Sequence, residues 1–357
     1  MATESNPIKA VDRAGAAVSI LAALPLISDP LPGIGGIIKA MPEHFVVEEV
    51  LPYTACGQGE HVYVTFRRTG TNTADAARIL QERLNLAASD VGWGGRKDKT
   101  AVVVQTISLR CGLSRPLVEI EKALDGLAFE ILAINRHGNK IKTGHVAANR
   151  FDIIVSGIQP EALPRALAIA DRLRQTGIPN FYGPQRFGVA MRNVQRGFDL
   201  FRKRGRVRKD LFMASVVQSA LFNIWLDRRI REGNFGRLLT GDIAKKTDTG
   251  GMFRVDDDAT ESARFKAGQI VYTGPMYGYK MKAAESVAGQ HEAALLDQFG
   301  LSAEDFRRLR CPGARREAIL KPTDLDIAAV NDGLRFTFTL PSGAYATTVL
   351  REFIKPA

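Results

Sequence analysis

One aspartate of this chain lies in a setting that would suit catalysis. Asp98 stands between Lys97 and Lys99, shortly after the paired glycines at positions 94 and 95. Positive charge on both sides favours an ionised carboxylate, and glycine has no Cβ, so another backbone or a ligand can come close. Such a carboxylate is suited to act as a nucleophile or base on a polyanionic substrate. Taken alone, however, the same residues are more typical of a solvated surface turn.

A second stretch offers contacts to nucleic acid. Residues 135–151, NRHGNKIKTGHVAANRF, carry four basic side chains and two histidines and no acid, and such side chains can donate to phosphate oxygens. Phe151 follows Asn149 and Arg150, so a flat apolar ring lies beside polar donors that could stack on and hydrogen-bond an extruded nucleobase. The ordinary alternatives are a core position for Phe151 and a solvated loop for the basic residues.

Two further stretches are unusual in composition. Residues 177–188, GIPNFYGPQRFG, interleave aromatic residues with Gly, Pro, Asn and Arg. This pattern is typical of a rigid, shaped loop that either lines a nucleic-acid groove or joins two domains. Residues 185–209 contain nine Arg and Lys, beginning with Arg186, and a single acid, Asp199. A third basic cluster lies at residues 307–316.

Composition narrows the classes of function. Lys and Arg number 49 against 38 Asp and Glu, a net charge of +11, which favours a nucleic-acid partner over an anionic membrane. The three cysteines are far apart and form no CxxC pair, so we expect no zinc site and no disulfide framework, as suits a reducing cytoplasm. No phosphate-binding GxxxxGK[ST] loop, no GxGxxG between a strand and a helix, and no GxSxG appears, which disfavours an ATPase, a dehydrogenase and a serine hydrolase.

The first 30 residues call for a separate interpretation. An apolar run over residues 18–27 follows Lys9 and Arg13 and loosely resembles a signal peptide. Pro25 and Pro30 flank residues 26–29, no A-x-A triplet follows closely, and the run is too short to span a bilayer. We therefore expect residues 1–30 to be a partly ordered lead-in, with secretion as the alternative.

Hydrophobic periodicity predicts interleaved strands and helices without strict βαβ regularity, which favours an α+β sheet with helices on one face. The predicted strands span residues 39–50, 60–68, 102–109, 129–135, 151–156 and 334–340, with a weaker strand pattern over 345–353. The predicted helices span residues 73–86, 117–127, 160–175 and 210–231, the first with Asn72 or Thr73 as its N-cap. The glycine-punctuated stretches 241–251 and 268–278 are predicted to be loops. The simplest layout is a sheet domain interrupted by a basic, helical insertion.

Four segments of the chain together resemble the TruD family of tRNA pseudouridine synthases. The segments are GGRKDKTAVVVQTISL, NRHGNKIKTGHVAANRF, IPNFYGPQRFG and the terminal LPSGAYATTVLRE, which follow the family's order between residues 37 and 353. The resemblance implies an α+β fold: a pseudouridine-synthase catalytic domain with a mixed, mainly antiparallel sheet, and an inserted, mostly helical TruD-specific domain. We expect a lead-in at 1–30, catalytic segments at 31–179 and 313–357, and the insertion at 180–312.

The resemblance also implies roles for individual residues. Asp98 occupies the place of the catalytic aspartate in the family's KDK motif, and Lys39 that of the basic residue beside it. Asn149 and Phe151 match an Asn-x-Phe element next to the target uridine, with Phe151 as the stacking ring. The candidates for substrate binding are Phe151, Asn149, Phe45, Lys97 and Arg186.

The function implied is isomerisation of uridine to pseudouridine in tRNA, at uridine 13 with tRNA-Glu favoured, without cofactor or metal. We expect a monomeric cytoplasmic enzyme whose partner is tRNA and which does not bind membranes. The alternative is a non-catalytic RNA-binding or RNA-folding protein. Asp98 disfavours this alternative, because an anion in a phosphate-binding groove is costly unless chemistry needs it. An enzyme for a small anionic metabolite is disfavoured because the basic clusters occupy three separate segments.

Overall fold

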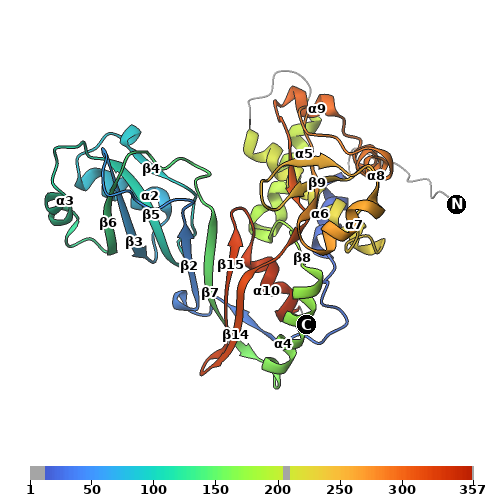
Figure 1. Cartoon of the computed structure of the whole chain (residues 1–357), viewed down its shortest axis with the longest axis horizontal. Coiled ribbons are helices and arrows are strands. Elements are labelled where there is room, and N and C mark those ends of the chain that lie inside the picture. The colour runs from blue at the N-terminus through green and yellow to red at the C-terminus, as the bar shows by residue number, and fades with distance from the viewer. Residues whose placement is uncertain (1–12, 204–209, 356–357) are drawn as a thin grey trace. The chain divides into compact units, whose positions relative to one another are not determined.

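The computed structural model of this chain describes residues 13–203 and 210–355, so the first 12 residues of the predicted lead-in and the basic residues 204–209 lie outside it. The described chain divides into two compact units (Figure 1). The nine-stranded unit contains residues 30–171, 322–346 and the end of the chain from Phe353, and the four-stranded unit contains the rest. The assignment of these segments to a catalytic and an inserted domain remains a prediction.

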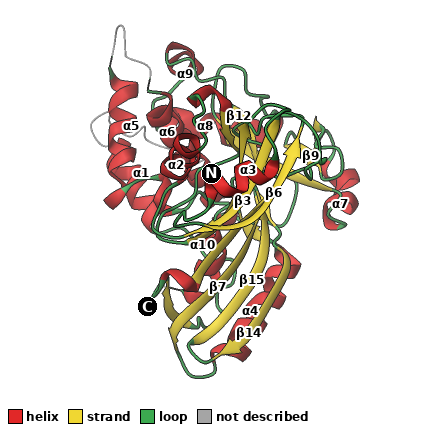
Figure 2. Ribbon diagram, turned by 90° about the vertical axis from the view of Figure 1, so that its left-hand side faces the viewer, coloured by secondary structure: helices red, strands yellow, loops and turns green. Residues whose placement is uncertain are grey.

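The nine-stranded unit is built on one sheet. Its strands are β1 Gly35–Ile38, β2 Phe45–Val50, β3 His61–Arg68, β4 Val91–Trp93, β5 Val102–Arg110, β6 Glu130–His137, β7 Ala148–Ile158, β14 Thr323–Val330 and β15 Gly333–Pro341. The order is β14-β15-β7-β2-β5-β3-β6, with β1 on β7 and β4 on β5. β2 and β5 run parallel, whereas pairs such as β7 with β15 and β3 with β5 are antiparallel, and Figure 2 shows β7, β15 and β14 side by side. The predicted mixed, mainly antiparallel sheet is thus confirmed.

Two helices cover one end of this sheet. They are α2 Thr73–Arg83 and α3 Leu117–Leu124, and their apolar residues pack on β3 in a buried cluster that includes Phe66, Leu80 and Ile120. The α2 helix begins as predicted, because the Asn72 side chain accepts a hydrogen bond of 3.0 Å from the Asp75 amide. Two more helices, α4 Ala162–Thr176 and α10 Ala346–Ile354, contain residues of both units.

The prediction of a strand over residues 345–353 was wrong, because this segment forms the helix α10. Its β-branched residues around Val349 favour a strand locally. The residues that become buried, however, recur at helical intervals of three and four; they are Ala346, Val349, Leu350 and Phe353.

The four-stranded unit combines a small sheet with helices. The sheet order is β10-β9-β11-β12, from β9 Ile243–Lys246, β10 Met252–Arg254, β11 Ile270–Met276 and β12 Ala314–Glu317; β8 Ile178–Pro179 pairs separately with β13 Ile319–Leu320. The helices lying wholly in this unit are α1 Arg13–Ala22, α5 Arg192–Arg202, α6 Leu211–Arg231, α7 Asp258–Lys266, α8 Ser286–Gln298 and α9 Ala303–Arg308. The long α6 was predicted, and it forms much of the buried core together with α1 and α5. No helix in residues 13–203 and 210–355 has the length and hydropathy needed to cross a membrane.

The predicted loops at 241–251 and 268–278 were wrong, because they contain the strands β9 and β11. Gly274 shows why a glycine stands inside a strand here. A Cβ at Gly274 would lie 2.3 Å from the ring of Trp225 and 2.7 Å from that of Phe222, both on α6. The glycine therefore allows a helix to approach the strand closely and does not mark a turn.

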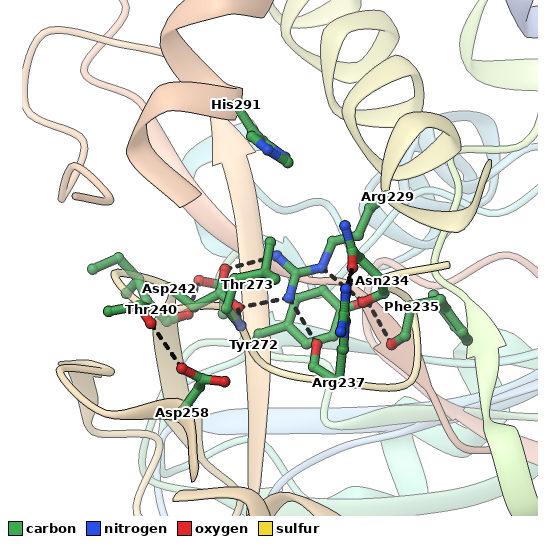
Figure 3. A network of polar contacts seen from close by, with 12 residues as sticks. Arg229, Asn234, Phe235, Arg237, Thr240, Asp242, Asp258, Tyr272, Thr273 and His291 are labelled. Carbon is green, nitrogen blue, oxygen red and sulfur yellow. Dashed lines mark hydrogen bonds and ion pairs between the residues drawn. The ribbon is translucent and has the colours of Figure 1, made fainter. Parts of the chain in front are cut away.

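A buried ion pair fixes the connection between α6 and β9 (Figure 3). Arg229 donates to both carboxylate oxygens of Asp242, at 2.7 and 2.6 Å, and the two side chains are 3% and 2% exposed. The guanidinium also donates to the carbonyl oxygens of Asn234 and Arg237 and lies 3.8 Å from the centroid of the Tyr272 ring. One side chain thus satisfies several polar groups of the 234–242 connection inside the core.

We predict that Asp242→Asn lowers the free energy of unfolding of this unit by about 3–5 kcal/mol, because it leaves the Arg229 charge buried without a counterion. Urea unfolding followed by Trp225 fluorescence, in a Trp93→Phe background that removes the other of the two tryptophans, would measure the loss. The control Glu304→Gln removes the exposed Arg307–Glu304 pair and should change stability by no more than about 0.5 kcal/mol. An equally small effect of Asp242→Asn would contradict the assigned role.

Candidate functional site

The predicted site residues of the nine-stranded unit gather on one face of its sheet. Residues directly opposite each other on neighbouring strands project to the same face. Phe151 of β7 lies between Val47 of β2 and Phe338 of β15. Asn149 of β7 likewise lies opposite Glu49 of β2. Strand register therefore brings segments distant in the sequence into two adjacent rows.

Asp98 lies in the loop between β4 and β5, as predicted. The glycines before it permit close backbone packing: a Cβ at Gly94 would lie 2.6 Å from Val146 and 2.9 Å from the carbonyl oxygen of His145. The carbonyl oxygen of Gly94 accepts a hydrogen bond of 2.8 Å from the Gly144 amide. The two stretches that the sequence singled out, 94–98 and 135–151, thus pack against each other.

The carboxylate of Asp98 is anchored although it remains accessible. Its Oδ2 lies 3.1 Å from Lys39 Nζ and accepts a hydrogen bond of 2.9 Å from the Thr100 hydroxyl, while Oδ1 accepts one of 3.3 Å from the Thr100 amide. The side chain is 56% exposed. Partial burial raises the pKa of Asp98, but the hydrogen bonds from Lys39 and Thr100 outweigh it and hold the pKa below that of an ordinary aspartate.

Lys39 connects this carboxylate to an aromatic surface. Its backbone has φ = 60°, in the left-handed region, which costs a residue with a Cβ on the order of 1 kcal/mol. The strained residue follows the end of β1 directly, and its Nζ also lies 4.6 Å from the centroid of the Phe45 ring, within cation–π range. Strain of this kind tends to occur at functional sites.

Three phenylalanines form what we call the apolar wall: Phe45, Phe151 and Phe338. The Phe45 and Phe151 rings meet edge to face at 6.2 Å and 74°, and the Phe151 and Phe338 rings lie 5.5 Å apart at 33°. Phe45 and Phe151 are each 8% exposed. The wall therefore presents only small parts of the Phe45 and Phe151 rings to a ligand, while Phe338 is buried, and stacking by Phe151 remains a prediction.

Asn149 leaves an acceptor available beside the wall. Its Oδ1 is buried, and no described residue donates a hydrogen bond to it. A buried acceptor without a donor costs about 1–3 kcal/mol. A ligand that carries an N–H group could satisfy this oxygen on binding.

The other two predicted binding residues have partners within the protein. Lys97 Nζ donates to Glu49 Oε2 at 2.7 Å, and its side chain is 11% exposed. Arg186 belongs to the four-stranded unit, where it donates to the hydroxyls of Ser219 and Ser215 at 3.0 and 2.7 Å. A role for either in binding substrate remains a prediction.

Sequence reasoning missed two contributors to this site. It assigned support for the Asp98 charge to Lys39 and the two flanking lysines, but Thr100 provides two of the hydrogen bonds. An aspartate two residues before a threonine is the local pattern that could have indicated this turn. Glu49 was also missed. It shares the buried face of its strand with Phe45 and Val47, and an acidic residue at such a position is a recognisable sign of a buried polar contact. Within residues 13–203 and 210–355, no group of three or more His, Cys, Asp or Glu is placed to hold a metal ion.

Comparisons with known proteins agree on one family. The family model for tRNA pseudouridine synthase D (TruD) matches residues 26–204 and 206–353. The chain is similar to tRNA pseudouridine synthase D of Anaeromyxobacter dehalogenans, with 41% identity over 343 residues covering 93% of this chain and 96% of that protein. It is 37% identical over 335 residues to the protein of the same name from Thermus thermophilus, covering 93% and 92% of the two chains. A crystal structure of a TruD protein from Methanosarcina mazei shares the fold, with a TM-score of 0.74 at 22% identity and coverage of 93% and 96%.

The site geometry predicts that Lys39→Met raises the pKa of Asp98 toward the ordinary aspartate value, because the mutation removes the ammonium bound to the carboxylate. Titration of the Asp98 carboxyl carbon by NMR would measure this. Lys99→Met is the matched control, since it removes a neighbouring positive charge of the KDK triplet and should move the pKa less. A larger shift in the control would mean that the flanking lysine, not Lys39, holds Asp98 ionised.

Proposed function

The chain belongs to the TruD family of tRNA pseudouridine synthases, and from this membership we propose that it isomerises uridine to pseudouridine in tRNA. We further propose that its target is uridine 13 and that tRNA-Glu is favoured. The observation that carries the proposal is the accessible, ionised Asp98, which Lys39 joins to the apolar wall. The lowered pKa keeps this exposed carboxylate ionised, which is the form that can act as a nucleophile or base.

The reaction exchanges one glycosidic bond for another within the same nucleotide. The N1–C1′ bond breaks, the detached uracil turns, and C5 bonds to C1′; the C5 proton then leaves and N1 carries a proton in the product. No electrons are exchanged with another molecule, so the proposed reaction requires no redox cofactor. Asp98 would either attack C1′ to form a covalent intermediate or remove the C2′ proton to give a glycal, and both routes begin from the ionised carboxylate.

The remaining residues are proposed to hold the base during this exchange. Phe151 would contact the flat face of the uracil, and base–aromatic stacking is worth about 1–3 kcal/mol in other systems. The unpartnered Oδ1 of Asn149 could accept from uracil N3–H, a donor that is present before and after the rearrangement. Phe45 would shape the site through its contacts with Lys39 and Phe151.

Binding to tRNA would come from the basic segments. The target uridine must leave its stack at a cost of a few kcal/mol, and contacts to phosphates supply affinity without sequence preference. We include Arg186 and Lys97 among the proposed binding residues on the basis of the sequence. A monomeric state and a cytoplasmic location belong to the same proposal.

We predict that Asp98→Asn lowers the rate of pseudouridine formation by at least about 1,000-fold while tRNA binding is retained. The amide has nearly the shape of the carboxylate but lacks its charge, so it can neither attack C1′ nor accept the proton. Single-turnover conversion of a tRNA transcript, with binding measured in parallel, would check this. Asp125→Asn, an exposed loop residue, is the control, and turnover at the wild-type rate by Asp98→Asn would remove Asp98 from the mechanism.

The choice of target is tested in cells. Carbodiimide-based pseudouridine mapping of total tRNA should show loss of the signal at position 13 when the gene is deleted, most clearly in tRNA-Glu. Wild-type protein should restore the signal and Asp98→Asn should not. Loss at a different position would replace the proposed target, and an unchanged map would favour an RNA-binding role.

A further inference from the structure

A buried polar cluster lies directly beneath the Asp98 loop. We call it the loop support, and its members are Glu49, Arg68, Thr73, Lys97 and Gln105. Apart from Lys97, whose side chain is 11% exposed, each member is no more than 7% exposed. These residues come from β2, β3, β5, the start of α2 and the loop itself. The cluster therefore joins the loop to the frame of the sheet.

Lys97 is held through both its side chain and its backbone. Its Nζ donates to Glu49 Oε2 at 2.7 Å, and its backbone amide donates to the Thr73 hydroxyl at 2.9 Å. Two residues earlier, the carbonyl oxygen of Gly95 accepts a hydrogen bond of 2.8 Å from Gln105 Nε2. Two hydrogen bonds with buried side chains thus fix the backbone immediately before Asp98, and a third contact holds the Lys97 side chain.

The orientation of Gln105 is determined by its neighbours. Its amide nitrogen donates to Gly95 and, at 3.2 Å, to Glu49, so both protons are used. Its oxygen accepts from the Thr73 hydroxyl at 3.0 Å and from Arg68 at 3.4 Å. A flipped amide would place like groups together, so the cluster admits one arrangement.

A contribution to stability does not explain why the loop support contains buried charges. Removing a carboxylate and an ammonium from water is costly, and apolar residues of similar volume often stabilise a protein as well or better. Glu49 Oε1 and Arg68 Nε are in addition buried without a hydrogen-bond partner among the described residues. A cluster with these costs is better explained by the geometry that it enforces.

We infer that Glu49 is a positioning residue: through its ion pair with Lys97 and its bond to Gln105, it fixes the loop so that the Asp98 carboxylate meets Lys39 and Thr100. The inference rests on the proposed function, because it assigns to Glu49 an effect on the rate of that reaction. Glu49 acts on substrate only through Asp98. Errors of about 1 Å in placing a reacting group can lower a rate by about 100-fold.

The test compares Glu49→Gln with Glu130→Gln, which makes the same chemical change in the exposed Arg67–Glu130 pair of the same unit. At saturating tRNA, the single-turnover rate of Glu49→Gln should fall by about 100-fold with tRNA affinity retained. The acidic limb of its pH–rate profile should move to higher pH, because a displaced Asp98 loses the Lys39 and Thr100 hydrogen bonds that lower its pKa. Glu130→Gln should show neither change.

A folded Glu49→Gln variant with the wild-type saturating rate, or with an unmoved acidic limb, would overturn the inference. If Glu49→Gln does not fold, the double variant Glu49→Gln/Lys97→Gln, which removes both charges of the ion pair together, is judged by the same two criteria. Failure of both to fold would also overturn it, since the loop support would then determine folding and not placement.

The proposed function and the positioning role can fail separately. If the wild-type protein forms no pseudouridine, the proposed function is wrong. The NMR titration of Asp98 in Glu49→Gln then still tests the positioning, because this measurement needs no substrate. The pKa of Asp98 should rise in Glu49→Gln and not in Glu130→Gln.

Discussion

The ion pair between Lys39 and Asp98 is the interaction on which the rest of the site depends. A carboxylate that is 56% exposed would ordinarily exchange freely between water and its neighbours. Here one lysine, 59 positions away in the sequence, approaches Oδ2 to 3.1 Å and also lies against the Phe45 ring. The charge and the apolar wall are thereby brought together by a single side chain whose backbone is strained. The proposed chemistry needs both at once, an anion to react and a flat surface to hold the base.

Two lysines near Asp98 serve different tasks. Lys97 turns inward to Glu49, although it precedes Asp98 directly in the sequence. The accessible carboxylate is consequently supported from outside the triplet, by Lys39 and Thr100, while the buried pair holds the loop. This separation lets Asp98 remain open to a substrate without being free to move, which a cluster of surface charges alone would not achieve, because exposed ion pairs are weak.

The two units show the same use of buried polar groups at different places. In the four-stranded unit, Arg229 and Asp242 satisfy the backbone of a connection inside the core, and in the nine-stranded unit Glu49 and Lys97 form a buried ion pair beneath the Asp98 loop. Local patterns predicted most strands and helices of the nine-stranded unit, but in the four-stranded unit they predicted the long helix α6 and none of the strands. They failed at β11, where Gly274 serves the approach of α6, and at α10, where β-branched residues concealed helical spacing. Both failures reflect packing partners that are distant in the sequence.

The sequence by itself determined the chemistry that is available. The KDK triplet with its glycines, the Asn-x-Phe element and the basic segments indicated an ionised aspartate, an aromatic contact and a polyanionic substrate, since these are properties of residue types at short spacing. Only the tertiary structure decided which charge serves which purpose. Strand register aligned Phe151 with Phe338 and Asn149 with Glu49, and the loop geometry directed Lys97 away from Asp98 and Lys39 toward it. Such pairings depend on the directions of side chains across a folded sheet, which short-range sequence patterns do not encode.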